Sequence, residues 1–419
     1  MAARKMETDG ATDRVTAPFP IPPLAARLFT IAATSGYEAR IVGGAVRDWL
    51  AGREIGDIDM AIAAPIDRAA ALFRDAGLKV IDTGLEHGTV TVVDDGQHLE
   101  VTQTRVDLET DGRHAIVAFS DDWAADAARR DFTINALYAD AGGQIEDPLG
   151  GQADLEAGVL RFVGVATQRV EEDALRMLRY CRFLQHFGRA GIDQEALAAL
   201  ADKAGLAAML SGERIAAELR RMLGAPGART GIGLMQDTGL ANAALGVALD
   251  AGRLTPEIDQ LVEDGIGDEG SAWLVRLAVI AQPGDAASLS ARLRLSRRDS
   301  HFLATLDRDQ PEADVGSLTG TIWQQSAWWL WRAGSAPAAC LVVAGGRAGR
   351  QIEMPQLARL AAWVPPEFPL AGADLLSHGV DSGPALGEML RTAEREWVDR
   401  GFVPTRAELL VFLGLDPVA

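Results

Sequence analysis

Residues 41–65, IVGGAVRDWLAGREIGDIDMAIAAP, constrain the fold of this chain more than any other stretch. A short apolar segment leads into the glycine pair Gly43-Gly44, and a second apolar segment surrounds Asp57 and Asp59. The pattern predicts a strand, a tight glycine turn, one short helix, a loop and a second strand. The charged residues of this stretch should therefore gather where the two strands meet their connecting turn and loop.

The glycine turn has the features of a phosphate site. Gly43 and Gly44 carry no Cβ, so a ligand can approach the backbone closely. The helix that follows offers unpaired N–H groups that suit a phosphate. Arg47 adds a guanidinium group that can bind two phosphate oxygens at once.

Asp57 and Asp59 lie two residues apart on the expected second strand, so both carboxylates should face the same side. Two adjacent carboxylates repel each other unless a cation lies between them, and Mg²⁺ is the usual cation beside a triphosphate. A glycine pair or a D-x-D pair alone is common on ordinary surfaces. Their combination in this order predicts a bound nucleoside triphosphate with Mg²⁺ on the aspartate pair.

GGAVRD followed by GDIDMA resembles the head signature of the tRNA nucleotidyltransferase and poly(A) polymerase family, and most closely its bacterial-type CCA-adding class. The resemblance is specific over residues 38–223 and moderate over residues 369–410. It implies an α+β fold, in which a nucleotidyltransferase head with a mixed β-sheet precedes an all-helical neck, body and tail.

The expected domains follow from this resemblance and from local composition. Residues 1–22 are polar and proline-punctuated, without the apolar core of a secretory signal, and we expect a disordered leader. The head should cover residues 23–150, and the helical neck with a nucleotide-selecting helix residues 151–225. Residues 226–419 should form a helical body and tail that bind tRNA.

Composition limits the function classes. The formal net charge is −19, whereas general nucleic-acid binders usually carry a basic surface, so an RNA partner must meet a local basic region. No run of 18 apolar residues predicts a membrane span. Cys181 and Cys340 lie in apolar helical contexts, which favours two buried thiols in a reducing compartment, and we expect a cytoplasmic protein.

The middle of the head predicts a β-hairpin. Residues 86–93 and 98–105 alternate in polarity around Asp95-Gly96, a strong hairpin turn. Glu100 on the return strand is either a third carboxylate near the aspartate pair or a solvated strand residue. Helices are expected over residues 24–34, 69–76 and 123–128.

Residues 129–137, RRDFTINAL, match a motif of the same family. A surface charge cluster is normally only solvated, but the resemblance implies that Arg130 reaches the triphosphate. It also implies that Asn135 helps to hold the nucleotide, with Asp131 in a supporting role.

Residues 171–187, EEDALRMLRYCRFLQHF, predict a single amphipathic helix with a charged row along it. Such a row can be a set of ion pairs on a wet face. The spacing also resembles the family motif EDxxRxxR, which implies a helix facing the incoming base, with Glu172 bracing Arg176. The charged row, a candidate nucleotide-binding set, comprises Asp173, Arg176, Arg179 and Arg182.

Residues 211–223 predict another helix, SGERIAAELRRML, which resembles the family motif ERIxxEL. The resemblance implies that this helix supports the preceding one, and Glu213 is expected to be structural. The tryptophan cluster of residues 323–331 favours a core position over base stacking.

The resemblance implies a CCA-adding tRNA nucleotidyltransferase with tRNA, CTP and ATP as partners, Mg²⁺ as cofactor and no membrane association. The residues themselves indicate no oligomeric state. A poly(A) polymerase of the same family shares the catalytic motifs and remains an alternative. A non-catalytic RNA- or nucleotide-binding protein is the alternative from another class, but it should have a damaged aspartate pair, and Asp57 and Asp59 are intact.

Overall fold

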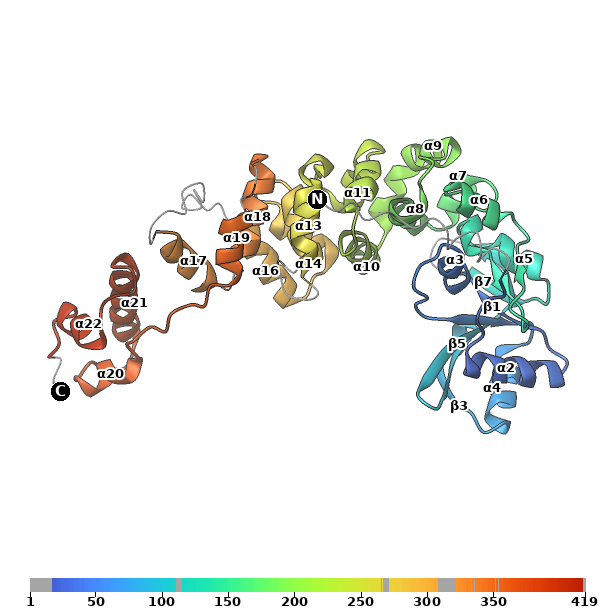
Figure 1. Cartoon of the computed structure of the whole chain (residues 1–419), viewed down its shortest axis with the longest axis horizontal. Coiled ribbons are helices and arrows are strands. Elements are labelled where there is room, and N and C mark those ends of the chain that lie inside the picture. Colours follow the sequence, from blue (N-terminus) through green and yellow to red (C-terminus); the bar gives the residue numbers. More distant parts are fainter. Residues whose placement is uncertain are drawn as a thin grey trace. The chain divides into compact units, whose positions relative to one another are not determined.

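The computed structural model describes residues 17–110, 115–264, 271–307, 322–332, 336–350 and 354–416, with Ile266, Gly334 and Ile352. The chain divides into two compact units (Figure 1). The first comprises Met1–Leu210 and Asp237–Ala244, and the second Ser211–Gln236 and Leu245–Ala419. The finer division expected at residues 150 and 225 remains a prediction.

The first unit is built on a mixed seven-stranded sheet in the order β3-β4-β5-β2-β1-β8-β9, which confirms the expected α+β head. Two further strands, β6 and β7, form a separate ribbon. The strands are β1 (Ala39–Val42), β2 (Asp59–Ile62), β3 (Lys79–Gly84), β4 (Thr89–Asp94), β5 (Gln97–Gln103), β6 (Arg105–Thr110), β7 (Ala115–Phe119), β8 (Tyr138–Ala139) and β9 (Ile145–Glu146).

The register of the central strands aligns one row of residues across the sheet. Asp59 on β2 pairs with Glu100 on the parallel strand β5 and with Val42 on the antiparallel strand β1. Val42 in turn pairs with Tyr138 on β8. The start of β2 therefore lies between the first half of β5 on one side and the end of β1 on the other.

Two helices of the head, α2 (Pro23–Thr34) and α4 (Ile66–Asp75), contact each other and the sheet strands through their apolar faces. The leader was expected to be disordered over residues 1–22. Residues 1–16 lie outside the described part, but Phe19 is 2% exposed and packs edge-on against Trp49. The expectation is therefore wrong for residues 17–22, because this apolar side chain completes the head core.

The predicted hairpin is confirmed. β4 and β5 are antiparallel and are joined by Asp95-Gly96, whose φ angles of 44° and 77° match a tight hairpin turn. The first predicted strand begins later than expected, because Leu85–His87 form a short 3₁₀ helix before β4. Helix α5 (Trp123–Ala128) has its predicted bounds, and Asp122 caps its N-terminus.

Helices complete the first unit: α3 (Gly44–Leu50), α6 (Gly151–Ala157), α7 (Ala166–Glu172), α8 (Leu175–Phe187) and α9 (Gln194–Lys203). The single helix predicted over residues 171–187 is wrong. The chain breaks at Asp173, whose φ and ψ of −151° and 104° are extended. The Asp173 side chain accepts the Leu175 N–H at 3.0 Å, so a local hydrogen bond competes with the helical ladder.

The second unit is helical in its described residues. The sequence division between the units falls within two helices, α11 (Ala228–Asp237) and α12 (Leu240–Leu245). The other helices of the second unit are α10 (Gly212–Leu223), α13 (Pro256–Glu263), α14 (Ala272–Ile280), α15 (Ala286–Leu293), α16 (Arg297–Asp307), α17 (Ile322–Arg332), α18 (Pro337–Ala348), α19 (Met354–Ala361), α20 (Gly372–Ser377), α21 (Pro384–Asp399) and α22 (Arg406–Phe412).

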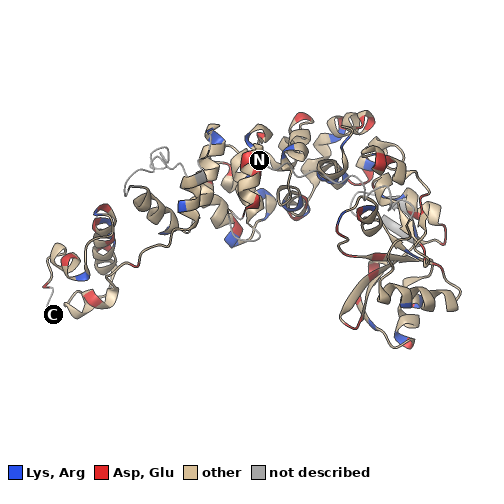
Figure 2. Ribbon diagram, viewed as in Figure 1, with Lys and Arg blue, Asp and Glu red and all other residues tan. Residues whose placement is uncertain are grey.

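Charged residues of both signs occur along the helices of this second unit (Figure 2). Several basic side chains are engaged by acidic partners; Arg276, only 1% exposed, binds Asp259 at 2.7 Å. Trp328 is 3% exposed and packs against Trp397, so the core position expected for the tryptophan cluster holds for this residue.

Both cysteines are buried and free, as expected. Burial raises the pKa of the Cys181 thiol far above its usual value, so this thiol stays protonated. Within the described residues, we find no helix with the length and apolar character needed to span a bilayer.

Candidate active site

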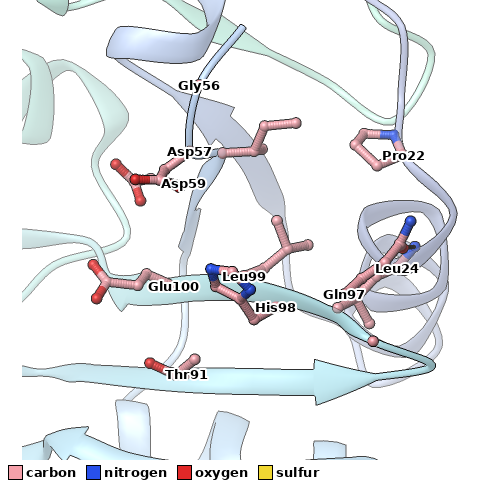
Figure 3. Close-up of a pocket in the computed structure, with 12 residues that line it drawn as sticks. Pro22, Leu24, Gly56, Asp57, Asp59, Thr91, Gln97, His98, Leu99 and Glu100 are labelled. Atoms are coloured by element: carbon pink, nitrogen blue, oxygen red, sulfur yellow. Dashed lines mark hydrogen bonds between the residues drawn. The ribbon is translucent and has the colours of Figure 1, made fainter. Parts of the chain in front are cut away.

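Three carboxylates meet where β2 and β5 run side by side (Figure 3). Asp59 is the first residue of β2 and pairs in register with Glu100. Asp57 was expected on the same strand, but it lies in the loop just before β2. Its charge still acts on Asp59, so the predicted carboxylate pair is present with one member on a loop.

The pKa of the Asp59 carboxyl group is raised to about 6, first by burial and then by the charges of Glu100 and Asp57, against a smaller lowering by Arg130. The three carboxylates therefore repel one another, and a bound cation would relieve this repulsion. Of the two readings of Glu100, its register beside Asp59 supports the third carboxylate over the isolated strand residue.

The donor set fits Mg²⁺. Among the residues that the structure describes, no three His, Cys, Asp or Glu side chains already stand at metal-binding spacing. Mg²⁺ commonly takes only one or two protein carboxylates and completes its octahedron with water and phosphate oxygens. Asp57 and Asp59 can supply that share of the ligands.

The glycine turn lies beside the carboxylates at the end of β1. Gly43 has a φ of 68°, in the region that favours glycine. A Cβ there would lie 3.2 Å from Nη1 of Arg130 and 3.5 Å from the Asn135 carbonyl oxygen. The absence of a side chain thus lets Arg130 and Asn135 approach the turn that precedes α3.

Arg47 was predicted to bind phosphate, but its guanidinium already has protein partners. Its Nε and Nη2 donate to the two carboxylate oxygens of Asp48 at 2.9 Å each, and Nη1 donates to Oδ1 of Asn135 at 2.6 Å. The guanidinium also lies over the rings of Phe183 and Phe187, 4.9 and 4.7 Å from their centroids. Arg47 therefore ties α3 to Asn135 and to α8.

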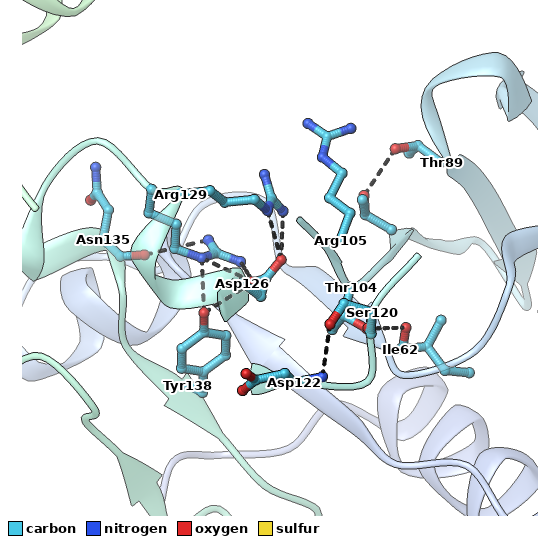
Figure 4. A network of polar contacts seen from close by, with 12 residues as sticks. Ile62, Thr89, Thr104, Arg105, Ser120, Asp122, Asp126, Arg129, Asn135 and Tyr138 are labelled. Atoms are coloured by element: carbon cyan, nitrogen blue, oxygen red, sulfur yellow. Dashed lines mark hydrogen bonds and ion pairs between the residues drawn. The ribbon is translucent and has the colours of Figure 1, made fainter. Parts of the chain in front are cut away.

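A buried acidic residue organises the arginine pair of the RRD motif (Figure 4). Asp126 is 0% exposed, and its Oδ1 accepts from Nη2 of Arg129 at 2.7 Å while its Oδ2 accepts from Nη2 of Arg130 at 3.0 Å. The Tyr138 hydroxyl donates to Oδ2 of Asp126 at 3.0 Å and accepts from Nε of Arg130 at 3.1 Å. These contacts hold Arg130 beside the glycine turn and the carboxylates.

Asp131 connects the motif to α8. Its Oδ2 lies 2.6 Å from Nη2 of Arg179, and its Oδ1 accepts from Nδ2 of Asn135 at 2.9 Å. Burial alone would raise the pKa of Asp131, but the Arg179 charge and the Asn135 hydrogen bond outweigh it and hold the pKa below its usual range. Arg179, predicted to bind nucleotide, thus has an acidic partner within the head.

The EDxxRxxR segment spans the break between α7 and α8: Glu172 ends α7, Asp173 lies in the break, and the arginines lie on α8. Glu172 lies 2.6 Å from Nη1 of Arg176, which confirms the predicted bracing contact. Arg176 also donates to the carbonyl oxygens of Arg169 and Arg129 at 3.1 and 3.3 Å. Arg182 lies with its guanidinium 4.4 Å from the Phe183 ring centroid.

Known proteins share both the sequence and the fold of this chain. Residues 39–161 match the family described as "Poly A polymerase head domain", and residues 191–246 match "Probable RNA and SrmB- binding site of polymerase A". The mouse mitochondrial CCA tRNA nucleotidyltransferase 1 is 33% identical over 391 residues, which cover 91% of this chain and 87% of that protein. A CCA-adding enzyme of Lacticaseibacillus paracasei is 35% identical over 384 residues, 90% of this chain and 92% of the relative.

The chain belongs to the CCA-adding nucleotidyltransferase family. Among solved structures, the Bacillus stearothermophilus CCA-adding enzyme in complex with CTP superposes with a TM-score of 0.68. It is 28% identical, and the match covers 93% of this chain and 96% of that one. The family resemblance inferred from the head motifs is therefore confirmed over nearly the whole chain.

The predicted site residues belong to the first unit, with one exception. Glu213 lies on α10, in the second unit, where its exposed side chain pairs with Arg294 at 2.7 Å. This ion pair agrees with a structural role. Sequence reasoning missed Asp126 and Tyr138; Asp126 stands three and four residues before the two arginines, a helical spacing that indicates ion pairing.

Proposed function

We propose that this protein adds C, C and A in sequence to the 3′ end of tRNA, using CTP and ATP and releasing pyrophosphate. The observation that carries the proposal is the register of Asp59 with Glu100, beside the Gly43 turn and Arg130. This arrangement combines carboxylates for a metal with a close backbone approach and a cation for phosphate. The family membership of the chain supports the same activity.

The reaction is an in-line displacement. The RNA 3′-hydroxyl gives up its proton to solvent and its oxygen forms a bond to the α-phosphorus, while the bond from that phosphorus to the bridging oxygen breaks and pyrophosphate leaves with the electron pair. Mg²⁺ held by Asp57 and Asp59 would lower the pKa of the attacking hydroxyl and neutralise charge on the leaving oxygens. Glu100 adds a third negative charge beside the pair and favours the bound cation.

In this proposal the triphosphate lies on the side of the carboxylates where Arg130 and the Gly43 turn stand. Arg130, fixed by Asp126 and Tyr138, supplies positive charge to the triphosphate. The absence of a Cβ at Gly43 and Gly44 lets the backbone approach the phosphates closely. Arg47 contributes chiefly by holding Asn135 toward the nucleotide.

Base choice falls to Asp173, in the break between α7 and α8, and to Arg176 in the first turn of α8. Cytosine and adenine both carry an exocyclic amino group that a carboxylate can accept from, next to a ring nitrogen that a guanidinium can donate to. Guanine and uracil present a carbonyl at the corresponding position. Arg179 and Arg182, further along α8, would act on phosphate or RNA binding, Arg179 through Asp131.

The decisive experiment incubates the protein with tRNA that ends at its discriminator nucleotide, with labelled CTP and ATP separately and together. CTP alone should add two residues, and the mixture should add three. ATP alone giving a long tail would identify a poly(A) polymerase, and no incorporation would favour a non-catalytic binding protein. Asp57→Ala and Asp59→Ala should each abolish transfer without unfolding the protein. A cytoplasmic location stays a prediction.

A further inference from the structure

Arg169, in the last turn of α7, contacts both the end of α5 and the EDxxRxxR segment. Its Nη1 donates to the carbonyl oxygen of Ala128 at 3.0 Å, and its Nη2 donates to Oε1 of Glu172 at 2.7 Å. The Arg169 side chain is 18% exposed, so most of it is enclosed by the head. One guanidinium group thus bridges two elements that the proposed function gives different tasks.

The contact with Ala128 joins α7 to the helix that positions the arginine pair. Ala128 is the last residue of α5, and the final carbonyl groups of a helix have no partner within it. The same helix carries Asp126, whose carboxylate holds Arg130 at 3.0 Å. Arg169 is therefore connected through α5 to the cation that is proposed to bind the triphosphate.

The contact with Glu172 acts on the other side. The two oxygens of the Glu172 carboxylate serve two arginines, since Oε1 accepts from Arg169 and Oε2 accepts from Nη1 of Arg176 at 2.6 Å. A glutamate side chain that is held at one oxygen has fewer orientations for the other. Arg169 therefore restricts the group that orients Arg176.

The backbone completes a closed ring of contacts around Arg176. Its Nη1 also donates to the carbonyl oxygen of Arg169 at 3.1 Å, and its Nη2 donates to the carbonyl oxygen of Arg129 at 3.3 Å. Arg129 directly follows Ala128, so the side chain of Arg169 links the two backbone segments that accept from Arg176. A shift of α7 against α5 would change the orientation of the Arg176 guanidinium.

We propose that Arg169 is a positioning residue for base selection. It holds Glu172 and the end of α5 together, so that the Arg176 guanidinium keeps one orientation relative to a triphosphate bound at Arg130. Cytosine and uracil differ at the edge that a carboxylate and a guanidinium can read, and small displacements of such groups weaken the discrimination. The inference rests on the proposed function and assigns a residue that acts through Glu172 and Arg176.

The test measures kcat/KM for CTP and for UTP with the full-length protein and tRNA that ends at the discriminator nucleotide. Arg169→Ala should lower the ratio of the two values by about three- to tenfold, the effect expected from losing one hydrogen bond that orients the reading group. A merely structural loosening of the head would lower kcat/KM for both nucleotides and leave their ratio unchanged. The ratio therefore separates positioning from stability.

Arg189→Ala is the matched control. Nη2 of Arg189 donates to the carbonyl oxygens of Leu155 and Glu156 at 3.2 Å each, so this arginine also binds the last turn of a helix, α6, in the same unit. The printed contacts of Arg189 lie outside the ring around Arg176, and its removal should leave the CTP to UTP ratio unchanged. Thermal unfolding checks that both variants are folded. Arg169→Lys, which keeps the charge but not the planar fork, serves if Arg169→Ala is not folded.

A second arm tests whether Arg169 acts through Arg176. In an Arg176→Ala background, the further change Arg169→Ala should alter the CTP to UTP ratio by less than about twofold, because the group that it orients is gone. A further loss as large as in the wild-type background would overturn the proposed route. An unchanged ratio in Arg169→Ala alone would overturn the positioning role.

The outcomes distinguish the inference from the function on which it rests. If the wild-type protein incorporates no nucleotide, the proposed function fails. If Arg176→Ala selects CTP over UTP as wild type does, the base is not read by Arg176, and the role of Arg169 fails with that assignment. If Arg176→Ala loses selectivity while Arg169→Ala keeps it, only the positioning role of Arg169 fails.

Discussion

Oδ2 of Asp126 accepts a hydrogen bond from the guanidinium of Arg130 at 3.0 Å, and the Asp126 side chain is fully buried. Its other carboxylate oxygen binds Arg129 at 2.7 Å, so one buried acid serves two arginines. These charge-assisted hydrogen bonds hold the pKa of Asp126 below its usual range, although burial alone would raise it. Asp126 therefore stays ionised and can position Arg130 at any physiological pH.

Asp126→Asn should impair the binding of both nucleotides, because an amide offers one acceptor oxygen to two arginines. We expect the KM for CTP and for ATP to rise by about tenfold, without a change in their ratio, since phosphate contacts do not read the base. The free energy of unfolding should fall by up to about 3–5 kcal/mol, as when one partner of a buried ion pair is removed. Steady-state kinetics and urea unfolding measure the two effects.

Tyr138→Phe is the matched control for this change. It removes only the hydroxyl group, so the free energy of unfolding should fall by about 0.5–1.5 kcal/mol. Nucleotide affinities of Asp126→Asn equal to those of wild type at a temperature where it is folded would contradict the positioning role.

The carboxylate cluster predicts an unusual pH dependence. Asp59 must be ionised to bind a cation, and its pKa is raised to about 6. Activity at limiting Mg²⁺ should therefore fall as the pH drops through about 6. Higher Mg²⁺ should move this limb to lower pH, because the cation competes with the proton. Glu100→Gln should also move it lower, since one repelling charge is gone.

The same shift affects stability in the absence of metal. The folded pKa of Asp59 exceeds its ordinary value of 3.8, so the folded state binds the proton more tightly than the unfolded state. Stability should decrease as the pH rises from about 4 to about 6, and Asp59→Asn should remove this decrease. Asp95→Asn, in the exposed hairpin turn, is the control and should leave both pH profiles unchanged. A pH-independent unfolding midpoint in wild type would contradict the shift.

Local pattern predicted the parts of the site that lie close together in sequence. The hairpin turn at Asp95-Gly96 is such a short-range signal, and it was found. The charge of Asp57 acts on Asp59, but Asp57 lies in the loop before β2 and not on the predicted strand. The break at Asp173 was not predicted, because the apolar spacing of the helix continues through it. The contact of Arg47 with Asn135 joins residues 88 positions apart, and a single sequence carries no signal for such pairing.

Asp131 and Arg179 should be energetically coupled. Their side chains are 10% and 31% exposed and lie 2.6 Å apart, although they are 48 residues apart in sequence. A double-mutant cycle with Asp131→Ala and Arg179→Ala should give a coupling energy of about 0.5–3 kcal/mol in urea unfolding.

The pair Asp154 and Arg161 provides the control cycle. The Arg161 side chain is 52% exposed and its Nε lies 3.3 Å from Oδ1 of Asp154, so this coupling should stay below about 1 kcal/mol. A zero coupling between Asp131 and Arg179 would contradict the proposal that Arg179 acts through Asp131.

The last prediction concerns how the protein selects C and A without a template. Arg176 is held by Glu172 at 2.6 Å and by the carbonyl oxygens of Arg169 and Arg129, so its guanidinium is oriented before a nucleotide binds. A fixed bidentate contact to a base discriminates by about 1–3 kcal/mol. Asp173→Ala and Arg176→Ala should therefore admit UTP or GTP, while Asp57 and Asp59 still support transfer.

Glu172→Gln tests the orientation of Arg176 itself. It keeps the size of the side chain but removes the charge that fixes the guanidinium, so selectivity should weaken less than in Arg176→Ala. Each of the four nucleotides is offered alone to tRNA that ends at the discriminator nucleotide, and Arg161→Ala serves as a control outside this contact. If all three variants reject UTP and GTP as wild type does, the base is read by groups other than Asp173 and Arg176.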